Sequence, residues 1–362
     1  MFKYPKVNYI GNKEKIAKWI CDQFPEDAKT IFDAFSGGCS LSYEAKCRGM
    51  EVYTNDILEV NYHIANALIE NNKTLLDKTD IELIFSGESF EGFMFENYAN
   101  VFFFPEECKE LDLYRSNIEK LDSKEKKSLA LALMRRAMIR KMPYSRFTLN
   151  WDTIVQLRDE EYSYQKYKRK RAYHNQSFKH HFLENIDEYN NAVFDNRKNN
   201  IAYNDDVFNL IENVKADIIY LDPPYTGTMN NYFGFYGLID DFISSKKTEP
   251  FENNFVSKSE AVLLFDKLFS KLNNFKYWFL SYNNSSYPSK EELLYLLNKY
   301  SDNVQVIERK HNYQITGKNK KETNKEFLFI VKNEIYQENI KENYVTAELW
   351  RILEIDSWVY RF

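Results

Sequence analysis

Ala216-Asp217-Ile218-Ile219-Tyr220-Leu221-Asp222-Pro223-Pro224-Tyr225, the deciding stretch, carries the main sequence signal for the fold. It begins with a short apolar run, which is typical of a strand buried on both faces of a parallel sheet. Two consecutive prolines end the strand, because neither has an N–H for the ladder and each fixes its own φ. Ligands bind at the carboxyl ends of strands in open α/β sheets. We therefore expect Asp222, Pro223, Pro224 and Tyr225 to form a rigid rim at a binding site.

This rim suits a flat heterocycle that carries an exocyclic amino group. Tyr225 can stack on the face of the ring, and the Asp222 carboxylate and the Pro223 carbonyl can accept its two N–H bonds. Such an amine is a poor nucleophile, because its lone pair is delocalised into the ring, and two acceptors out of the ring plane favour the pyramidal form. The alternative is a simple turn after a core strand, which a lone Asp-Pro pair would favour.

Composition limits the class of protein. The chain has 362 residues, of which 44% are hydrophobic and 17% aromatic, so it is globular with room for one large domain or two modest ones. No apolar run is long enough to cross a membrane and no secretory signal is present, so we expect a cytoplasmic protein without a membrane partner. The four cysteines lack the spacing of a metal site or a disulfide framework, so no metal is expected.

Two further strands precede the deciding stretch. Residues 30–35 predict a strand that leads into a turn at Ser36-Gly37-Gly38, and residues 51–55 predict the next strand. Asp56 closes this second strand about 20 residues after the turn, where an acid can accept both ribose hydroxyls of a nucleoside. Capping of the following helix, 59–71, explains Asp56 equally well. The order of elements predicts a Rossmann-like α/β sheet.

The segment between the second strand and Asp222 interrupts this alternation. Residues 73–200 are aromatic, charged and mostly helical in pattern, for example at 124–141, with a loop expected around 150–164. Residues 135–181 contain twelve Lys and Arg against four Asp and Glu, a net charge of +8 in a chain that carries −5 overall. Such segregation predicts a basic face set against an acidic body.

Three motifs together resemble the Dam-like (alpha-group) adenine-specific DNA methyltransferases. Leu221-Asp222-Pro223-Pro224-Tyr225 is similar to their catalytic signature, and Asp33-Ala34-Phe35-Ser36-Gly37-Gly38 resembles their Asp/Glu-x-Phe-x-Gly-Gly loop for S-adenosylmethionine. An aromatic-x-Gly-x-Lys segment near the N-terminus of the family is matched by Tyr9 to Lys13. The family often has a third small residue, usually glycine, where this chain has Cys39. The resemblance covers residues 9–64 and 203–331.

The resemblance implies an activity and a set of site residues. The reaction would move a methyl group from S-adenosyl-L-methionine to the exocyclic amino group of adenine in duplex DNA, at a specific sequence and by base flipping. The extruded adenine would be held by Asp222, Pro223, Pro224 and Tyr225. The donor would be held by Tyr9, Gly11, Lys13, Asp33, Phe35, Ser36, Gly37, Gly38, Asp56, Asp206 and Asp222. Of two adjacent acids, Asp206 rather than Asp205 would receive the amino group of the donor's adenine.

The resemblance also implies a division of the chain. A Rossmann-like methyltransferase domain at 1–72 and 201–335 would be interrupted by a mostly helical target-recognition domain at 73–200, and a tail at 336–362 would follow. Cations interleaved with aromatic residues suit phosphates and unstacked bases. The predicted DNA contacts of this kind are Arg140, Lys141, Tyr144, Arg146, Lys168, Arg169, Lys170, Arg171, Lys318, Lys320 and Lys321.

The expected partners follow from the same resemblance. They are double-stranded DNA and, in a restriction-modification system, a cognate restriction endonuclease, with an orphan epigenetic role as the other setting. The cell would be bacterial or phage-infected, with the enzyme near the nucleoid. Two alternatives remain: an amino-methyltransferase for RNA adenine or DNA cytosine, and a non-catalytic DNA-binding subunit that keeps the fold. Cytosine enzymes of this kind more often carry Ser in place of Asp222.

Overall fold

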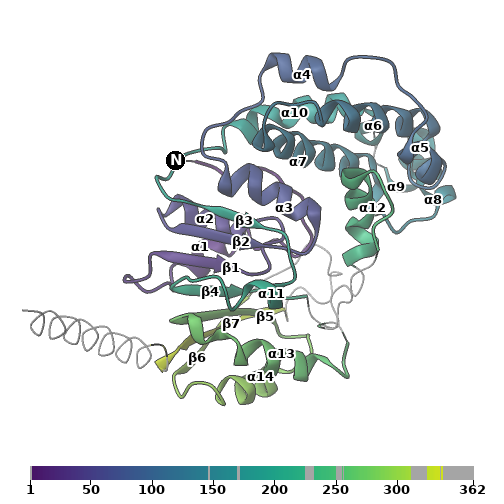
Figure 1. Ribbon diagram of the computed structural model, residues 1–362. Coiled ribbons are helices and arrows are strands. Elements are labelled where there is room, and N and C mark those ends of the chain that lie inside the picture. The colour runs from purple at the N-terminus through teal and green to yellow at the C-terminus, as the bar shows by residue number, and fades with distance from the viewer. Residues whose placement is uncertain are drawn as a thin grey trace, which may run out of the picture. The chain divides into compact units, whose positions relative to one another are not determined.

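The protein is described by a computed structural model that covers residues 2–145, 147–168, 172–224, 232–249, 255, 257–310, 324–334 and 336. The described strands form one seven-stranded sheet in the order β3-β2-β1-β4-β5-β7-β6 (Figure 1). The mixed sheet and its many helices agree with the predicted Rossmann-like α/β class. Within these ranges, no helix is both long enough and apolar enough to span a membrane.

The seven described strands include the three that were predicted, at 30–35, at 51–55 and in the apolar run before Asp222. They are β1 (Thr30–Asp33), β2 (Glu51–Asn55), β3 (Ile201–Tyr203), β4 (Ile218–Leu221), β5 (Tyr277–Asn283), β6 (Val304–Lys310) and β7 (Lys325–Lys332). β2 pairs with β3 and β4 pairs with β5 in parallel, whereas β7 runs antiparallel to both β5 and β6. In this register Ile219 of β4 lies opposite Trp278 of β5.

Most of the helices form one long run between β2 and β3. This run comprises α3 (Glu59–Ala65), α4 (Lys78–Ile84), α5 (Phe93–Tyr98), α6 (Pro105–Ile118), α7 (Lys124–Lys141), α8 (Trp151–Arg158), α9 (Glu160–Tyr167) and α10 (Phe178–Asn190). The other described α-helices are α1 (Ala17–Cys21) and α2 (Ser40–Cys47) before it, and α11 (Val207–Leu210), α12 (Tyr232–Ser244), α13 (Ala261–Ser270) and α14 (Lys290–Leu297) after it. The chain continues α3 as a π-helical turn at Asn66–Glu70. The predicted helical insertion is therefore present.

Contacts between Cα atoms divide the chain into two compact units. Unit 1 comprises residues 1–25, 33–207 and 229–253, and unit 2 comprises residues 26–32, 208–228 and 254–362. This division by compactness differs from the predicted division by function, in which residues 73–200 form a separate target-recognition domain. The functional division stays a prediction.

In unit 1, α7 is the central helix of the inserted run. Residues 128–139 are buried around the whole helix, which is typical of a helix inside a protein. It packs against α3, α10 and the π-helical turn. Ser123 caps its first turn by accepting the Lys126 N–H at 3.2 Å. The long insertion thus packs through α7 both on its own helix α10 and on the preceding segment, α3 and the π-helical turn.

In unit 2, β5 is the central strand, and all seven of its residues are buried. β4 flanks it on one side and β7 on the other. The start of β4 is tied to β1, because the Asp217 carboxylate accepts the Lys29 and Thr30 N–H groups at 2.7 and 3.0 Å. Thr30 Oγ1 in turn accepts the Asp217 N–H at 2.7 Å. The first residues of the deciding stretch therefore hold two neighbouring strands together.

Residues 150–164, expected as a loop, are mostly helical, and this expectation was wrong. α8 and α9 fill most of the range. Asn150 and Asp159 each accept an N–H group from the first turn of the helix that follows, at 2.9 and 2.8 Å. α8 buries Ile154 and Leu157. The apolar pattern is sparse here, and the capping residues rather than a hydrophobic stripe mark where the helices begin.

A buried ionic cluster joins α6, α7 and α8. Glu107 on α6 lies 2.8 Å from the Lys141 ammonium and 2.6 Å from the Arg158 guanidinium. Lys141 is 2% exposed and Arg158 is 6% exposed. Burial opposes the ionisation of Glu107, but hydrogen bonds from Arg158 and the charge of Lys141 outweigh it and lower the pKa of Glu107. The cluster therefore contributes to packing rather than to a charged surface.

Replacing Glu107 with alanine leaves two cations buried without their counter-charge. We expect Glu107→Ala to lower the free energy of unfolding by about 3–5 kcal/mol, the usual cost of breaking a buried ion pair. Urea unfolding followed by circular dichroism measures this loss. Glu106→Ala is the matched control, because Glu106 is an exposed neighbour on the same helix and should lose far less. Equal losses in the two variants would contradict the buried cluster.

Candidate active site

The chain leaves β1 through a tight turn at residues 36–39. The Ser36 N–H donates to the Asn55 carbonyl at 2.9 Å, so the turn is attached to the end of β2. Gly37 has a φ of +48°, in the left-handed region that favours glycine. Asp33 is 1% exposed and accepts a hydrogen bond from the Ser42 hydroxyl of α2. Asp33 therefore fixes α2 behind the turn.

The ring of Tyr9 lies directly against both glycines of this turn. A Cβ atom at Gly37 would be 2.7 Å from Tyr9 Cε1, and a Cβ atom at Gly38 would be 2.9 Å from Tyr9 Cβ. Both separations are shorter than real Cβ contacts, so only glycine fits at these positions. Tyr4 also donates a hydrogen bond to the Gly38 carbonyl. The N-terminal segment and the Gly37–Gly38 turn thus form one wall.

Asp56 links the same turn to the start of α3. One carboxylate oxygen accepts the Gly37 N–H at 2.9 Å, and the other accepts the Leu58 N–H at 3.0 Å. The side chain of Asn61 also hydrogen-bonds to this carboxylate. Burial raises the pKa of Asp56, although hydrogen bonds from Leu58, Asn61, Gly37 and the Ile57 backbone oppose the rise.

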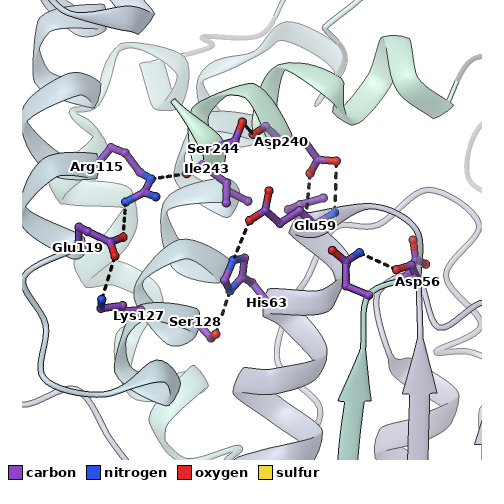
Figure 2. A network of polar contacts seen from close by, with 12 residues as sticks. Asp56, Glu59, His63, Arg115, Glu119, Lys127, Ser128, Asp240, Ile243 and Ser244 are labelled. Carbon is purple, nitrogen blue, oxygen red and sulfur yellow. Dashed lines mark hydrogen bonds and ion pairs between the residues drawn. The ribbon is translucent and has the colours of Figure 1, made fainter. Parts of the chain in front are cut away.

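The first turn of α3 is capped from α12 and not by Asp56. The Asp240 carboxylate accepts the Val60 N–H at 2.8 Å and the Glu59 N–H at 3.3 Å (Figure 2). The alternative in which Asp56 caps this helix is therefore wrong. Burial raises the pKa of Asp240 to about 7. Asp240 was not among the residues predicted from the sequence. The only sequence feature that marks it is a pair of acids, Asp240-Asp241, inside an otherwise apolar helix.

The ends of β2 and β3 are joined by side-chain and backbone hydrogen bonds. The Asn55 amide donates to the Asp205 carbonyl at 3.0 Å, and its oxygen accepts the Asp205 N–H at 3.1 Å. Asp206, the next residue, is exposed. Of the other residues predicted for the donor, Lys13 is 4% exposed and Gly11 has a φ of +83°. Unit 1 therefore gathers the ends of β1, β2 and β3 into one connected set of polar groups.

In unit 2, the deciding stretch ends as predicted. All four residues of β4 are buried, and the Tyr220 hydroxyl donates to Ser281 Oγ at 2.8 Å. The strand stops at Leu221, directly before Asp222-Pro223-Pro224. Asp222 and Pro224 are half-buried and Pro223 is buried, whereas Tyr225 lies outside the described residues. A carboxylate on a stiff, partly open strand end is thus present.

A family model matches most of the chain. Residues 9–294 match the D12 class N6 adenine-specific DNA methyltransferase family. The chain belongs to this family. The enzyme therefore methylates adenine in DNA, as the motifs implied, and the family gives no support to the cytosine alternative.

The similarity of this methyltransferase to its relatives extends over nearly the whole chain. The type II methyltransferase M2.HphI of Haemophilus parahaemolyticus is 60% identical over 331 residues, which cover 91% of this chain and 98% of that protein. The type II methyltransferase M.NlaIII of Neisseria lactamica is 24% identical over 90% of this chain and 98% of that protein. The modification methylase StsI of Streptococcus sanguinis is 25% identical over 92% of this chain, but the match spans only 53% of that protein.

The residues predicted to contact DNA differ in their surroundings. Tyr144 and Lys168 are exposed, and both have left-handed backbone conformations, with φ of +59° and +53°. The Arg140 guanidinium is partly exposed and lies 3.9 Å from the Glu184 carboxylate. Lys141 needs a correction, because its ammonium is buried in the cluster with Glu107 and is not open to a phosphate. The predicted contacts outside the described residues are Arg146, Arg169, Lys170, Arg171, Lys318, Lys320 and Lys321.

The segment 135–181 is less basic at its surface than its sequence indicates. Arg135, Arg136, Lys141 and Arg158 are all between 0% and 6% exposed. Four of the twelve cations in this segment therefore belong to the interior. The predicted basic face is correspondingly smaller, because a buried cation contributes packing and hydrogen bonds rather than a phosphate contact.

The raised pKa of Asp240 makes its contribution to stability depend on pH. A carboxyl that binds its proton more tightly in the folded state stabilises the fold at low pH, and this stabilisation is lost as the pH rises from 3.8, its ordinary pKa, to about 7. The negative charges of Glu59 and Asp56 act in the same direction. The sign of the effect is therefore a loss of stability with rising pH.

We expect this pH dependence to disappear in Asp240→Asn, which has no proton to lose. Relative to that variant, the free energy of unfolding of the wild type should fall by up to about 1.4 kcal/mol per pH unit across this range. Urea unfolding at several pH values between about 4 and 8 measures the difference. A difference between the two proteins that stays constant with pH would contradict the assignment.

Proposed function

We propose that this enzyme transfers the methyl group of S-adenosyl-L-methionine to the exocyclic amino group of an adenine that is flipped out of duplex DNA at a specific sequence. The observation that carries the proposal is the end of β4. A fully buried strand stops at Leu221, and a half-buried carboxylate and two prolines follow at once. Such a rim holds hydrogen-bond acceptors rigidly at the edge of the sheet where α/β proteins bind ligands.

The acceptor side of the site is the part that would bind the target adenine. It has to make the exocyclic amino group, a poor nucleophile, able to attack the methyl group. The Asp222 carboxylate and the Pro223 carbonyl would accept the two N–H groups of the adenine amine, and Tyr225 would stack on the base. The amine nitrogen forms a bond to the methyl carbon as the bond between that carbon and the donor sulfur breaks. The nitrogen then gives up one proton to solvent, and the donor leaves as a neutral thioether. The rate comes from positioning and from electrostatic groups fixed in advance.

The donor side of the site is the part that would bind the methyl donor. Here the wall of Tyr9 and the Gly37–Gly38 turn supports the binding of a nucleoside. The two glycines let the backbone approach a ligand closely. The half-buried Asp56 carboxylate would accept two ribose hydroxyls, and such donors would offset the burial that raises its pKa. S-adenosylmethionine fits this set, because its ribose offers two hydroxyls and its sulfonium activates the methyl group. The remaining proposed donor residues are Gly11, Lys13, Asp33, Phe35, Ser36, Asp206 and Asp222.

The helical insertion, residues 73–200, is proposed to read the DNA. The target adenine must leave the duplex, because its amino group is otherwise paired and stacked. Tyr144 and Lys168 are exposed on this insertion, and an aromatic side chain together with cations suits unstacked bases and phosphates. Further proposed phosphate contacts are Arg140, Arg146, Arg169, Lys170 and Arg171, with Lys318, Lys320 and Lys321 outside the insertion.

We propose restriction-modification as the biological setting. Two relatives are named type II methyltransferases and a third is named a modification methylase. Methylation at a specific sequence protects that sequence from an endonuclease that cuts there, so a cognate endonuclease is the proposed partner. All three relatives come from bacteria, and the proposed location is the bacterial cytoplasm at the nucleoid, where the DNA substrate lies.

Asp222→Ala tests the acceptor side, because it removes one acceptor from the target amine. We expect kcat to fall about 10²–10⁴-fold, the range for a positioned acid–base group, while the Kd of S-adenosylmethionine rises far less, because the other proposed donor residues are unchanged. Mass spectrometry of nucleosides from digested duplex DNA measures the turnover and identifies N6-methyladenine. Asp217→Asn is the control, since its carboxylate serves the other end of β4 and should affect stability alone. Turnover near wild type in Asp222→Ala would end the proposal.

Gly37→Ala tests the donor side. The new methyl group would lie 2.7 Å from the Tyr9 ring, so it would push Tyr9 away from the turn. We expect the Kd of S-adenosylmethionine to rise about tenfold or more, as for the loss of one well-placed contact. Gly49→Ala is a matched control, because Gly49 also has a left-handed φ, +81°, but its Cβ would meet nothing within 4 Å. Equal Kd values for the two variants would exclude this turn from the donor site.

A further inference from the structure

Two side chains on one face of α12 reach the proposed donor site. Tyr236 and Asp240 are four residues apart, so they lie one above the other on the same side of the helix. Both are buried, at 2% and 6% exposure. Tyr236 contacts the N-terminal segment that forms the wall with the glycine turn. Asp240 contacts the start of α3, just after Asp56.

Tyr236 holds the N-terminal segment in two ways. Its ring stacks on the ring of Tyr9, with centroids 5.0 Å apart and an angle of 8° between the planes. Its hydroxyl accepts the Ile10 N–H at 2.9 Å. The stacked ring backs Tyr9 where Tyr9 lies against Gly37 and Gly38. Tyr236 therefore fixes both the ring and the backbone of the segment that forms this wall.

Arg135 of α7 also binds the N-terminal segment. It is 0% exposed, and it donates to the Val7 carbonyl at 2.5 Å and to the Asn8 carbonyl at 3.4 Å. Its guanidinium also lies 5.8 Å from the Tyr9 ring and 5.4 Å from the Tyr236 ring. Asn8 has a φ of +55°, a conformation that costs a non-glycine residue free energy and persists only where surrounding contacts hold it.

Asp240 holds the second part of the donor side. It accepts the N–H groups of Glu59 and Val60 at the start of α3, as Figure 2 shows. From the same helix, the Asn61 side chain donates to the Tyr9 hydroxyl at 3.2 Å and also binds the Asp56 carboxylate. The contacts of α12 therefore converge on Tyr9 and Asp56 from two directions.

We propose that Tyr236 and Asp240 are positioning residues for the methyl donor. Tyr236 sets the place of Tyr9 against the glycine turn, and Asp240 sets the start of α3 and, through Asn61, the place of Asp56. This inference rests on the proposed donor site. The same helix begins seven residues after Tyr225, so the chain that forms the acceptor side continues directly into the element that organises the donor side.

Other contacts of α12 anchor its C-terminal end without involving the proposed donor residues. Arg115 donates to the Ile243 carbonyl at 2.5 Å (Figure 2). Tyr98 donates a hydrogen bond to the Asp241 carboxylate, and Thr248 donates its N–H to the same carboxylate at 2.7 Å. The C-terminal end of the helix is thus fixed independently, and it supplies a control that separates positioning from simple stability.

Tyr236→Phe is the decisive variant, because it keeps the stacked ring and removes only the hydroxyl, which accepts the Ile10 N–H and also bonds to the Arg135 side chain. We expect KM and Kd for S-adenosylmethionine to rise about five- to tenfold, the effect of one buried N–H left without its partner. The KM for DNA and kcat should stay within about twofold, because nothing that contacts DNA or the target base is changed. Tyr236→Leu, which also removes the stacking, should weaken donor binding further.

Tyr98→Phe is the matched control. It removes a buried tyrosine hydroxyl that bonds to Asp241, which lies on another face of the same helix than Tyr236 and Asp240, so it should lower stability without changing the KM for S-adenosylmethionine. Hydrogen exchange of the peptide that contains Ile10, measured by mass spectrometry without donor or DNA, gives a second readout. Exchange there should be faster in Tyr236→Phe than in wild type, and unchanged in Tyr98→Phe.

The outcomes separate this inference from the proposed function. If Tyr236→Phe raises the donor KM no more than Tyr98→Phe does, or leaves the exchange at Ile10 unchanged, the positioning role is overturned. If the wild-type protein shows no S-adenosylmethionine binding by titration, the proposed donor itself is wrong. Normal donor binding by the wild type, combined with an unaffected Tyr236→Phe variant, would remove the inference and leave the proposed function in place.

Discussion

The hydrogen bond from the Gly37 N–H to the Asp56 carboxylate is the contact on which the donor side of this methyltransferase depends. It joins the turn after β1 to the residue that directly follows β2, at 2.9 Å. The other groups at this end of unit 1 are arranged around it. Tyr9 covers the glycines from the N-terminal side, and Asn61 connects the Tyr9 hydroxyl to the Asp56 carboxylate. A change in any of these residues therefore reaches the same short stretch of backbone.

Charged side chains serve two separate purposes in this chain. Arg135, Lys141 and Arg158 are buried and bind carbonyl groups or Glu107, so their role is to hold helices and the N-terminal segment in place. Lys168 lies at the surface, where a phosphate can reach it. A count of cations along the sequence does not separate the two, because helical spacing alone does not show which face of α7 is covered by α3 and α10. The overall net charge of −5 is therefore a poor guide to the DNA-binding face.

Local signals account for what could be predicted from the sequence. α7 begins and ends where it was expected, at Lys124 and Lys141, because Ser123 is a strong capping residue and the segment is rich in helix formers. β4 stops before Asp222 because two prolines cannot continue a ladder. The order of strands also makes β1 and β4 neighbours, as a Rossmann-like sheet requires.

Long-range contacts account for what could not be predicted. Asp240 caps a helix that lies about 180 positions earlier in the chain, and Tyr236 stacks on a residue near the N-terminus. Neither pairing leaves a pattern in the local sequence. Lys141 was predicted to contact DNA, but it is buried beside Glu107. Glu107 lies in another helix, and only the packing of α6 against α7 brings the two side chains together.

A crystal structure of the protein with S-adenosylhomocysteine, the demethylated form of the donor, tests the central claim most directly. The account predicts that the nucleoside lies on the wall of Tyr9 and the Gly37–Gly38 turn, with both ribose hydroxyls bonded to the Asp56 carboxylate. A nucleoside bound elsewhere, with no ribose hydroxyl bonded to the Asp56 carboxylate, would contradict it.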